Sequence, residues 1–293
     1  MIGVRIAHGR HDDPRRYLAL PLAFYVLLAA FPLLATVAHG QGAAMVDPAS
    51  VVHVAAPGEA ITGIVRVTNP MEEVLRLRVY LSDWTLDPVG QFTFGDVGTL
   101  PASASTWITF SPSVLDIEPH ATREVRYEVQ VPAEAGAGTH QSVLFVESEP
   151  SEAVPGQMAA TFSVRVGHVV YVNVPPLVTE GAITAIFGEP PTTAGEPYHL
   201  TVLYENRGNA AQGVQGSLVV TDDLGETAIE ADVERSVVLP SSTRAFEMNL
   251  HGLLPGGTYT ALVVLGYGDV EREVAGSYDF VVPEIAADPD GAL

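Results

Sequence analysis

Short runs with a period of two dominate the chain beyond residue 43. In LRLRVYLS, residues 75–82, Leu and Val occupy every second position, and Arg, Tyr and Ser lie between them. In REVRYEVQV, residues 123–131, Val125, Tyr127 and Val129 share one side. This alternation is typical of a strand with one buried and one solvated face. No segment beyond residue 43 has the helical period, so the pattern predicts an all-β fold.

Similar runs, bounded by Pro, Gly, Asn and Asp, predict the other strands of a first domain. A corner at Glu118-Pro119-His120 separates two of them. Many short strands with turn signals between them indicate an antiparallel immunoglobulin-like β-sandwich. The further strands are expected at 50–58, 61–67, 106–110, 113–117, 142–147 and 161–174.

A second set of strands follows Pro175-Pro176. It is expected at 182–187, 198–206, 215–221, 231–239, 243–250, 258–266 and 273–281. The fold class is therefore two tandem immunoglobulin-like β-sandwiches, with domains at 44–176 and 177–284 and a polar tail at 285–293. In LLPGGTYTALVV a Pro-Gly turn leads to Tyr259, the place of a tyrosine corner. In PAEAGAGTHQSV, His140 holds the corresponding place.

The first 43 residues read as an export signal. Four Arg precede the apolar run YLALPLAFYVLLAAFPLLATVA, residues 17–38, and Ala38-His39-Gly40 permits cleavage before Gln41. The run is also long enough to remain as an N-terminal membrane anchor helix. Both alternatives place the remainder outside the cytoplasm, in the periplasm or cell envelope of a bacterium.

Charge narrows the choice of partner. The chain has no Lys and no Cys, and its 14 basic residues face 35 acidic ones. Such an acidic surface repels phosphate groups. This argues against binding of nucleic acid and against peripheral binding to anionic lipid membranes. A membrane contact is expected only through an uncleaved N-terminal segment. The acidity either keeps the protein soluble, or it binds cations or a basic partner.

Candidate chemistry is sparse, and the protein is expected not to be an enzyme. The six His beyond residue 43 lack metal-ligand spacing, and no nucleophile elbow, phosphate loop or dinucleotide fingerprint occurs. The acidic stretch Asp222-Asp223-Leu224-Gly225-Glu226 fits a hairpin turn better than a calcium site. No cofactor and no metal are therefore expected. An enzyme with an unrecognised site is the remaining alternative.

The longest strand pattern, MAATFSVRVGHVVYVNV at 158–174, is the candidate binding element. Gly167 interrupts it, which predicts a β-bulge. The strand either packs in the core against the second domain or forms an edge that accepts a strand of another chain. In the second case the residues expected at the contact are Arg165, His168, Val170 and Val172.

Three segments together resemble the N-terminal domain of PapD-like periplasmic pilus chaperones. They are VRVTNPMEEVLRLRVYLSDWTLD at 65–87, FSPSVLDIEPHATREVRYEVQVP at 110–132 and GTHQSVLFVES at 138–148. The resemblance covers about residues 46–175, and YENRGNAAQG at 204–213 looks like a generic bacterial immunoglobulin-like module.

The resemblance implies a protein that caps pilin subunits by lending them a strand and that anchors the subunit's carboxylate on a basic pair. Here the first strand offers only His53 for that pair, and the last strand offers Arg165 and His168. A neutral imidazole does not carry the permanent charge of Arg or Lys. A related possibility is an envelope protein that binds peptidoglycan or surface-layer partners.

Two functions follow as hypotheses. In the first, the protein is a PapD-like, non-enzymatic exported protein that binds another secreted or surface protein, with strand addition at 161–174 as one mode. In the second, it is a structural or adhesive envelope protein, held by its N-terminal helix and in contact with the cell wall or a partner through domain two.

Overall fold

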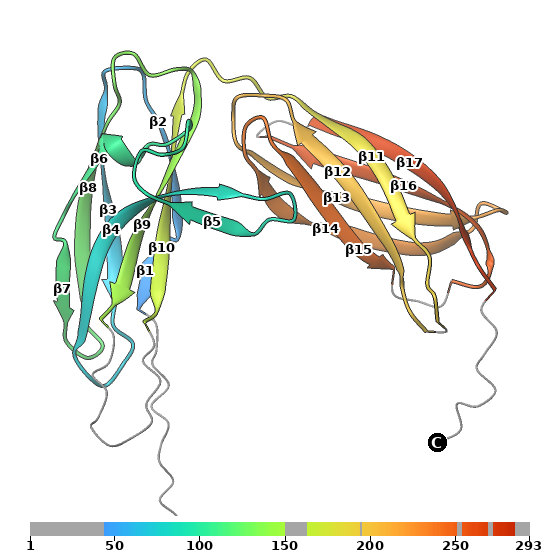
Figure 1. Ribbon diagram of the computed structural model, residues 1–293, viewed down its shortest axis with the longest axis horizontal. Helices are drawn as coiled ribbons and strands as arrows, with labels where there is room; N and C mark the ends of the chain where they lie inside the picture. Colours follow the sequence, from blue (N-terminus) through green and yellow to red (C-terminus); the bar gives the residue numbers. More distant parts are fainter. Residues whose placement is uncertain (1–43, 150–162, 194, 251–253, 269–271, 285–293) are drawn as a thin grey trace, which may run out of the picture. The chain divides into compact units, whose positions relative to one another are not determined.

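The computed structural model describes residues 44–149, 163–193, 195–250, 254–268 and 272–284. Within these ranges the chain forms seventeen strands and one turn of 3-10 helix, which confirms the all-β prediction (Figure 1). No helix of the described ranges is long and apolar enough to cross a membrane. The expected export segment, the tail and part of the run 158–174 lie outside the described residues.

The first ten strands form two sheets. One sheet has the order β1-β3-β8-β6, and the other has the order β2-β10-β9-β4-β5, with β7 also paired to β4. Their bounds, with the 3-10 helix η1, are β1 Met45–Asp47, β2 Ser50–Val54, β3 Ala60–Thr68, β4 Leu75–Leu86, β5 Phe92–Gly95, η1 Ser105–Trp107, β6 Ile108–Ser111, β7 Val114–Ile117, β8 Thr122–Gln130, β9 Gly138–Ser148 and β10 Arg165–Val174.

The core of the first sandwich is built from alternate residues of both sheets. Val65 and Val125 come from one sheet, and Leu144 and Val170 come from the other, all without exposed surface. Each fully buried side chain of this kind stabilises the fold by roughly 1.5–3 kcal/mol. The period of two along β3 and β8 therefore selects which face turns inward.

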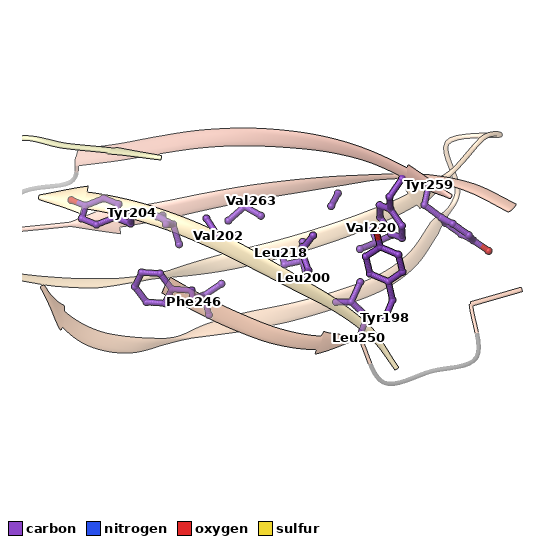
Figure 2. Close-up of a cluster of buried hydrophobic side chains, with 14 of the residues drawn as sticks. Tyr198, Leu200, Val202, Tyr204, Leu218, Val220, Phe246, Leu250, Tyr259 and Val263 are labelled. Atoms are coloured by element: carbon purple, nitrogen blue, oxygen red, sulfur yellow. The ribbon is translucent and has the colours of Figure 1, made fainter. Parts of the chain in front are cut away.

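The last seven strands form the second sandwich, with sheets β11-β12-β15 and β14-β13-β16-β17. No described strand of one sandwich pairs with a described strand of the other. Figure 2 shows Leu200, Val202, Leu218 and Val263 in its core. The bounds are β11 Gly181–Glu189, β12 Tyr198–Asn206, β13 Gln212–Asp222, β14 Thr227–Val238, β15 Thr243–Leu250, β16 Gly257–Tyr267 and β17 Arg272–Val282.

The tyrosine corner predicted at Tyr259 is confirmed. Its hydroxyl donates a hydrogen bond of 2.9 Å to the carbonyl of Pro255, four residues upstream. In the first sandwich, His140 Nε2 lies 3.0 Å from the carbonyl of Gly136, also four residues upstream. The imidazole of His140 thus takes the place of a tyrosine phenol, and it contacts the carbonyl at the same distance along the chain.

The two turns predicted at Glu118-Pro119-His120 and at Asp222–Glu226 are also present. At the corner after Ile117, Ala121 N–H donates to Glu118 O over 3.0 Å, and His120 adopts a left-handed φ of 58°. At the β13–β14 hairpin, Asp222 N–H donates to Glu226 O over 3.0 Å. Asp222 Oδ1 accepts the N–H groups of Leu224 and Glu226, so the acidic stretch serves the turn.

Three details differ from the sequence-based expectation. Strands β1 and β5 were not expected, because both are short and lack a sustained alternation. The strand expected from residue 161 begins at Arg165. The bulge predicted at Gly167 is wrong, because β10 pairs with β9 without a register shift from Arg165 to Val174. A Cβ at Gly167 would lie 2.8 Å from Val143 Cγ2, so the glycine permits close packing.

Candidate functional site

Strand β10 exposes part of its backbone at the sheet edge. Its even-numbered residues face β9, as the bond from Ser148 N–H to Val164 O over 3.0 Å indicates. Its odd-numbered residues face β2: Val169 N–H donates to Ala49 O over 2.9 Å, and Asn173 O accepts from Ala55 N–H over 3.1 Å.

Strand β2 covers only the second half of β10. The parallel pairing runs from Val169↔Ser50 to Asn173↔Val54. Arg165 and Gly167 have the same parity as Val169, and no described strand pairs with the outward side of their backbone. We call this unpaired backbone of residues 165–167, together with Ser50 where β2 begins, the stepped edge.

The step arises because the chain changes sheets just before β2. Strand β1 pairs with β3 of the opposite sheet, with Met45 opposite Thr68 and Asp47 opposite Arg66. The chain then turns through Pro48 and enters the other sheet at Ser50. The first half of β10 is therefore left without a neighbour on that side.

Three rings connect the strands at this step. Tyr127 of β8 places its hydroxyl 2.9 Å from His53 Nε2 of β2 and 3.4 Å from His168 Nε2 of β10. His168 Nδ1 lies 2.7 Å from the carbonyl oxygen of Pro48, at the β1–β2 corner. His168 has no exposed surface, and Tyr127 is 4% exposed.

Burial keeps this cluster uncharged at neutral pH. Desolvation lowers the pKa of His53 below its ordinary 6.5. Desolvation also lowers the pKa of His168, where the Pro48 carbonyl acts in the opposite direction and the charge of His53 acts in the same one. Burial raises the pKa of Tyr127 to about 12.

The outer face of the same sheet carries an aromatic and cationic cluster. The Arg165 guanidinium lies 4.9 Å from the ring centre of Phe94 and 4.7 Å from that of Phe145, a cation–π arrangement. Beside it, Arg78 pairs with Glu147 over 2.9 Å. Hydrogen bonds from Ser163, Arg78 and Tyr80 lower the pKa of Glu147 to about 2.

The structure separates the four residues expected at a partner contact. Arg165 is exposed at the stepped edge. His168, Val170 and Val172 have no exposed surface and point into the core. Strand β9 pairs with one side of this part of the strand and β2 pairs with the other side over residues 169–173, so it is not a free edge. Of the four, the structure exposes only the side chain of Arg165, and the expectation that they contact a partner stays a prediction.

Sequence reasoning missed Tyr127 and Phe94 as members of the site. Tyr127 was placed on the inward face of its strand, and its polar hydroxyl there was the available signal, because a buried hydroxyl needs a partner. Phe94 lies on the short strand β5, which the pattern did not reveal. The site depends on pairing between distant segments, which a periodic pattern does not encode.

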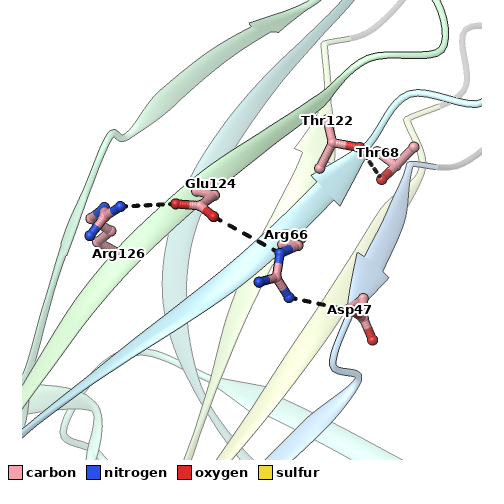
Figure 3. A network of polar contacts seen from close by, with 6 residues as sticks. All are labelled: Asp47, Arg66, Thr68, Thr122, Glu124 and Arg126. Carbon is pink, nitrogen blue, oxygen red and sulfur yellow. Dashed lines mark hydrogen bonds and ion pairs between the residues drawn. The ribbon is translucent and has the colours of Figure 1, made fainter.

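The opposite sheet of this sandwich presents a polar outer face. Figure 3 shows Asp47, Arg66, Glu124 and Arg126 in a line of ion pairs across β1, β3 and β8, with distances of 4.0, 3.9 and 3.0 Å. These side chains are well exposed, and such pairs contribute little to stability. This face is a solvated surface.

Within the described ranges, no cluster of three or more His, Asp or Glu side chains could hold a metal ion. The carboxylates near the stepped edge are engaged with Arg and Ser partners, as Glu147 is. The arrangement offers hydrogen-bonding backbone, apolar surface and one cation, which suit the binding of an extended peptide.

Comparisons with known proteins give similarity at the level of structure. No protein-family model matches the chain, and no curated protein matches it. Among solved structures, the class 5 fimbriae chaperone CfaA is 10% identical, with 83% of this chain and 100% of that chain covered and a TM-score of 0.44.

Two further solved structures are of the same kind. The CupB2 chaperone of Pseudomonas aeruginosa is 13% identical, with 80% and 98% of the two chains covered and a TM-score of 0.39. The CsuC-CsuE chaperone-tip adhesion subunit complex of Acinetobacter baumannii is 10% identical, with 84% and 100% covered and a TM-score of 0.41. These three solved structures are of a fimbriae chaperone, a second chaperone and a chaperone-tip adhesion subunit complex.

Proposed function

We propose that this protein is a non-enzymatic, exported binding protein that takes up an extended segment of another secreted or surface protein by β-strand addition at the stepped edge. Its role is chaperone-like, and its place is the periplasm or cell envelope of a bacterium. The observation that carries the proposal is the unpaired backbone of Arg165 and Gly167 beside the first residue of β2.

The chemistry of this edge suits a strand. An incoming strand that continues the line of β2 would satisfy the outward N–H and C=O groups of both residues. Its outward side chains would lie near Arg165, whose guanidinium has no carboxylate within ion-pair distance among the described residues. An acidic residue in the incoming strand would therefore find a charge partner.

The test compares two substitutions at one position. A synthetic peptide that alternates Val with Thr and carries one Asp is titrated against the protein. Arg165→Pro removes an outward N–H without disturbing the bonds to β9, since proline is tolerated where its nitrogen faces away from the ladder. Arg165→Ala removes the charge but keeps that N–H.

The proposal predicts that Arg165→Pro weakens peptide binding at least about tenfold, and that Arg165→Ala has a smaller effect. Equal binding by all three proteins would contradict strand addition at this edge. In that case, recovery of the protein in the envelope fraction with its N-terminal segment intact would favour an anchored scaffold.

A further inference from the structure

The cluster of His53, Tyr127 and His168 ties together three strands at the stepped edge. When both imidazoles are neutral, one arrangement of hydrogens satisfies all of its contacts. His53 Nε2–H donates to the Tyr127 oxygen, Tyr127 O–H donates to His168 Nε2, and His168 Nδ1–H donates to Pro48 O. Each imidazole is neutral in this arrangement.

Protonation of both imidazoles disrupts the arrangement. A single proton on His168 is accommodated when His53 shifts its own hydrogen to Nδ1 and its Nε2 accepts from the Tyr127 hydroxyl. When His53 is protonated as well, both Nε2 atoms carry a hydrogen and neither accepts from Tyr127. The Tyr127 oxygen then faces two donors, and its own hydrogen has no acceptor in the cluster. A buried hydroxyl without a partner and a buried charge are both unfavourable, and His168 has no exposed surface.

Among the residues that the structure describes, no opposite charge offsets the added protons. Gly63 lies against the Tyr127 ring from β3 and has no ionisable group. The ionisable residues near the cluster on β1, β3 and β8 point to the outer face of their sheet, where Asp47, Arg66, Arg126 and Glu128 are exposed. The ionisable group that acts on the pKa of His168 is His53, which has the same sign when protonated.

We propose that His53, Tyr127 and His168 form an acid-sensitive latch that holds β2 on β10, and that acidification releases β2 and extends the stepped edge toward Asn173. Release follows because β2 carries His53 and lies on the outer side of β10, so its departure admits water to both imidazoles. The free edge would then grow from residues 165–167 to 165–173.

The latch regulates the site of the proposed function, and its meaning as regulation rests on that function. The acid sensitivity of the latch also agrees with the direction of the pKa shifts of the two histidines. The pKa of each histidine is lowered, so below about pH 6.5 the folded state binds fewer protons than the unfolded state. The closed state therefore loses stability as the pH falls through this range.

The test is amide exchange along β10 in the full chain, followed residue by residue by NMR. The odd-numbered amides of Val169, Tyr171 and Asn173 face β2, and those of Val170 and Val172 face β9. After correction for intrinsic exchange, the odd-numbered amides should exchange at least about tenfold faster at pH 5 than at pH 7.5, while the even-numbered ones stay protected.

Matched variants isolate the titrating groups. His53→Gln and His168→Asn each keep one nitrogen in the place of the bonded imidazole nitrogen and do not titrate. Together they should abolish the pH dependence, whereas His199→Asn, at an exposed histidine of β12, should leave it unchanged. If the double variant does not fold, the contrast between odd and even amides of the wild type decides. Equal protection of the odd-numbered amides at both pH values would overturn the latch.

The alternating Val/Thr peptide separates this proposal from the proposed function. Acid opening of the odd-numbered amides with no peptide bound at either pH would support the latch and contradict strand addition. Equal peptide binding at both pH values, without acid opening, would support strand addition and overturn the latch.

Discussion

At the scale of single residues, buried polar groups hold the two sandwiches in shape. Asp83 has no exposed surface, and its carboxylate accepts from the N–H groups of Thr99 and Leu100 and from the hydroxyls of Ser103 and Ser105. It thereby fixes the loop between β5 and β6. Tyr259 holds the corner of the second sandwich by one hydroxyl bond.

Asp83→Asn should destabilise the protein by about 3 kcal/mol, because the NH2 group of the amide would face N–H and O–H donors that now bond to a carboxylate oxygen.

The contribution of Asp83 should also depend on pH. Burial raises the pKa of Asp83, but the hydrogen bonds from Ser103, Ser105 and the loop backbone outweigh it, so its pKa is lowered from 3.8. The stability that it contributes is present above about pH 3.8 and is lost as the pH falls through the lowered value. Unfolding in urea between pH 7 and pH 3 tests this. A variant as stable as the wild type at pH 7 would contradict the assignment; Asp116→Asn, in an exposed ion pair, is the control.

Tyr259→Phe should lower the free energy of unfolding by about 1 kcal/mol, since it deletes only the hydroxyl bonded to Pro255. Chemical denaturation measures the change.

His140→Gln should lower the free energy of unfolding less than His140→Ala does, because the Gln amide nitrogen can still reach the carbonyl of Gly136. If His140→Gln and His140→Ala lose the same stability, the imidazole does not act as a corner.

At the scale of elements, the pairing of β10 decides which residues are available. Its even-numbered backbone groups bond to β9, and its odd-numbered ones face β2 or the free edge. The side chains of Val170 and Val172 fill the core. The same strand is thus a core strand in its second half and an edge in its first half.

This pairing predicts opposite outcomes for two neighbouring proline substitutions. Val166→Pro removes an N–H that faces β9 and should destabilise the protein by at least about 2 kcal/mol. Arg165→Pro, one position earlier, keeps the bonds to β9 and should destabilise the protein by no more than about 1 kcal/mol, through the loss of its cation–π contacts. Thermal unfolding of both variants provides the comparison, and equal destabilisation would mean that the alternation has been assigned to the wrong residues.

The sequence pattern located most elements and the strand that carries the candidate site, but not the contacts within that site. The strands of the second sandwich were predicted because each has a sustained alternation bounded by Pro, Gly or Asp, as at β12 and β16. Strand β1 has only three residues, too few to show a period. His53 and His168 were each noted as candidates, but their shared contact with Tyr127 depends on the register of distant strands.

At the scale of the whole molecule, each sandwich has its own main core. The large cluster of the second sandwich contains only residues between Tyr198 and Val282, with Ile183 and Ile186 packed against it. Fragment 177–284 should therefore fold alone and unfold in one cooperative transition. Circular dichroism during heating tests this prediction. A fragment without a cooperative transition would place the domain boundary elsewhere.

The central claim is that the stepped edge accepts a strand, and amide exchange at residues 165–168 tests it most directly. In the free protein, the amides of Arg165 and Gly167 should exchange rapidly, and those of Val166 and His168 slowly. On binding of the alternating Val/Thr peptide, Arg165 and Gly167 should become protected at least about tenfold, because their outward N–H groups then bond to the added strand. Protection that appears elsewhere on the protein, with these two amides unchanged, would contradict the account.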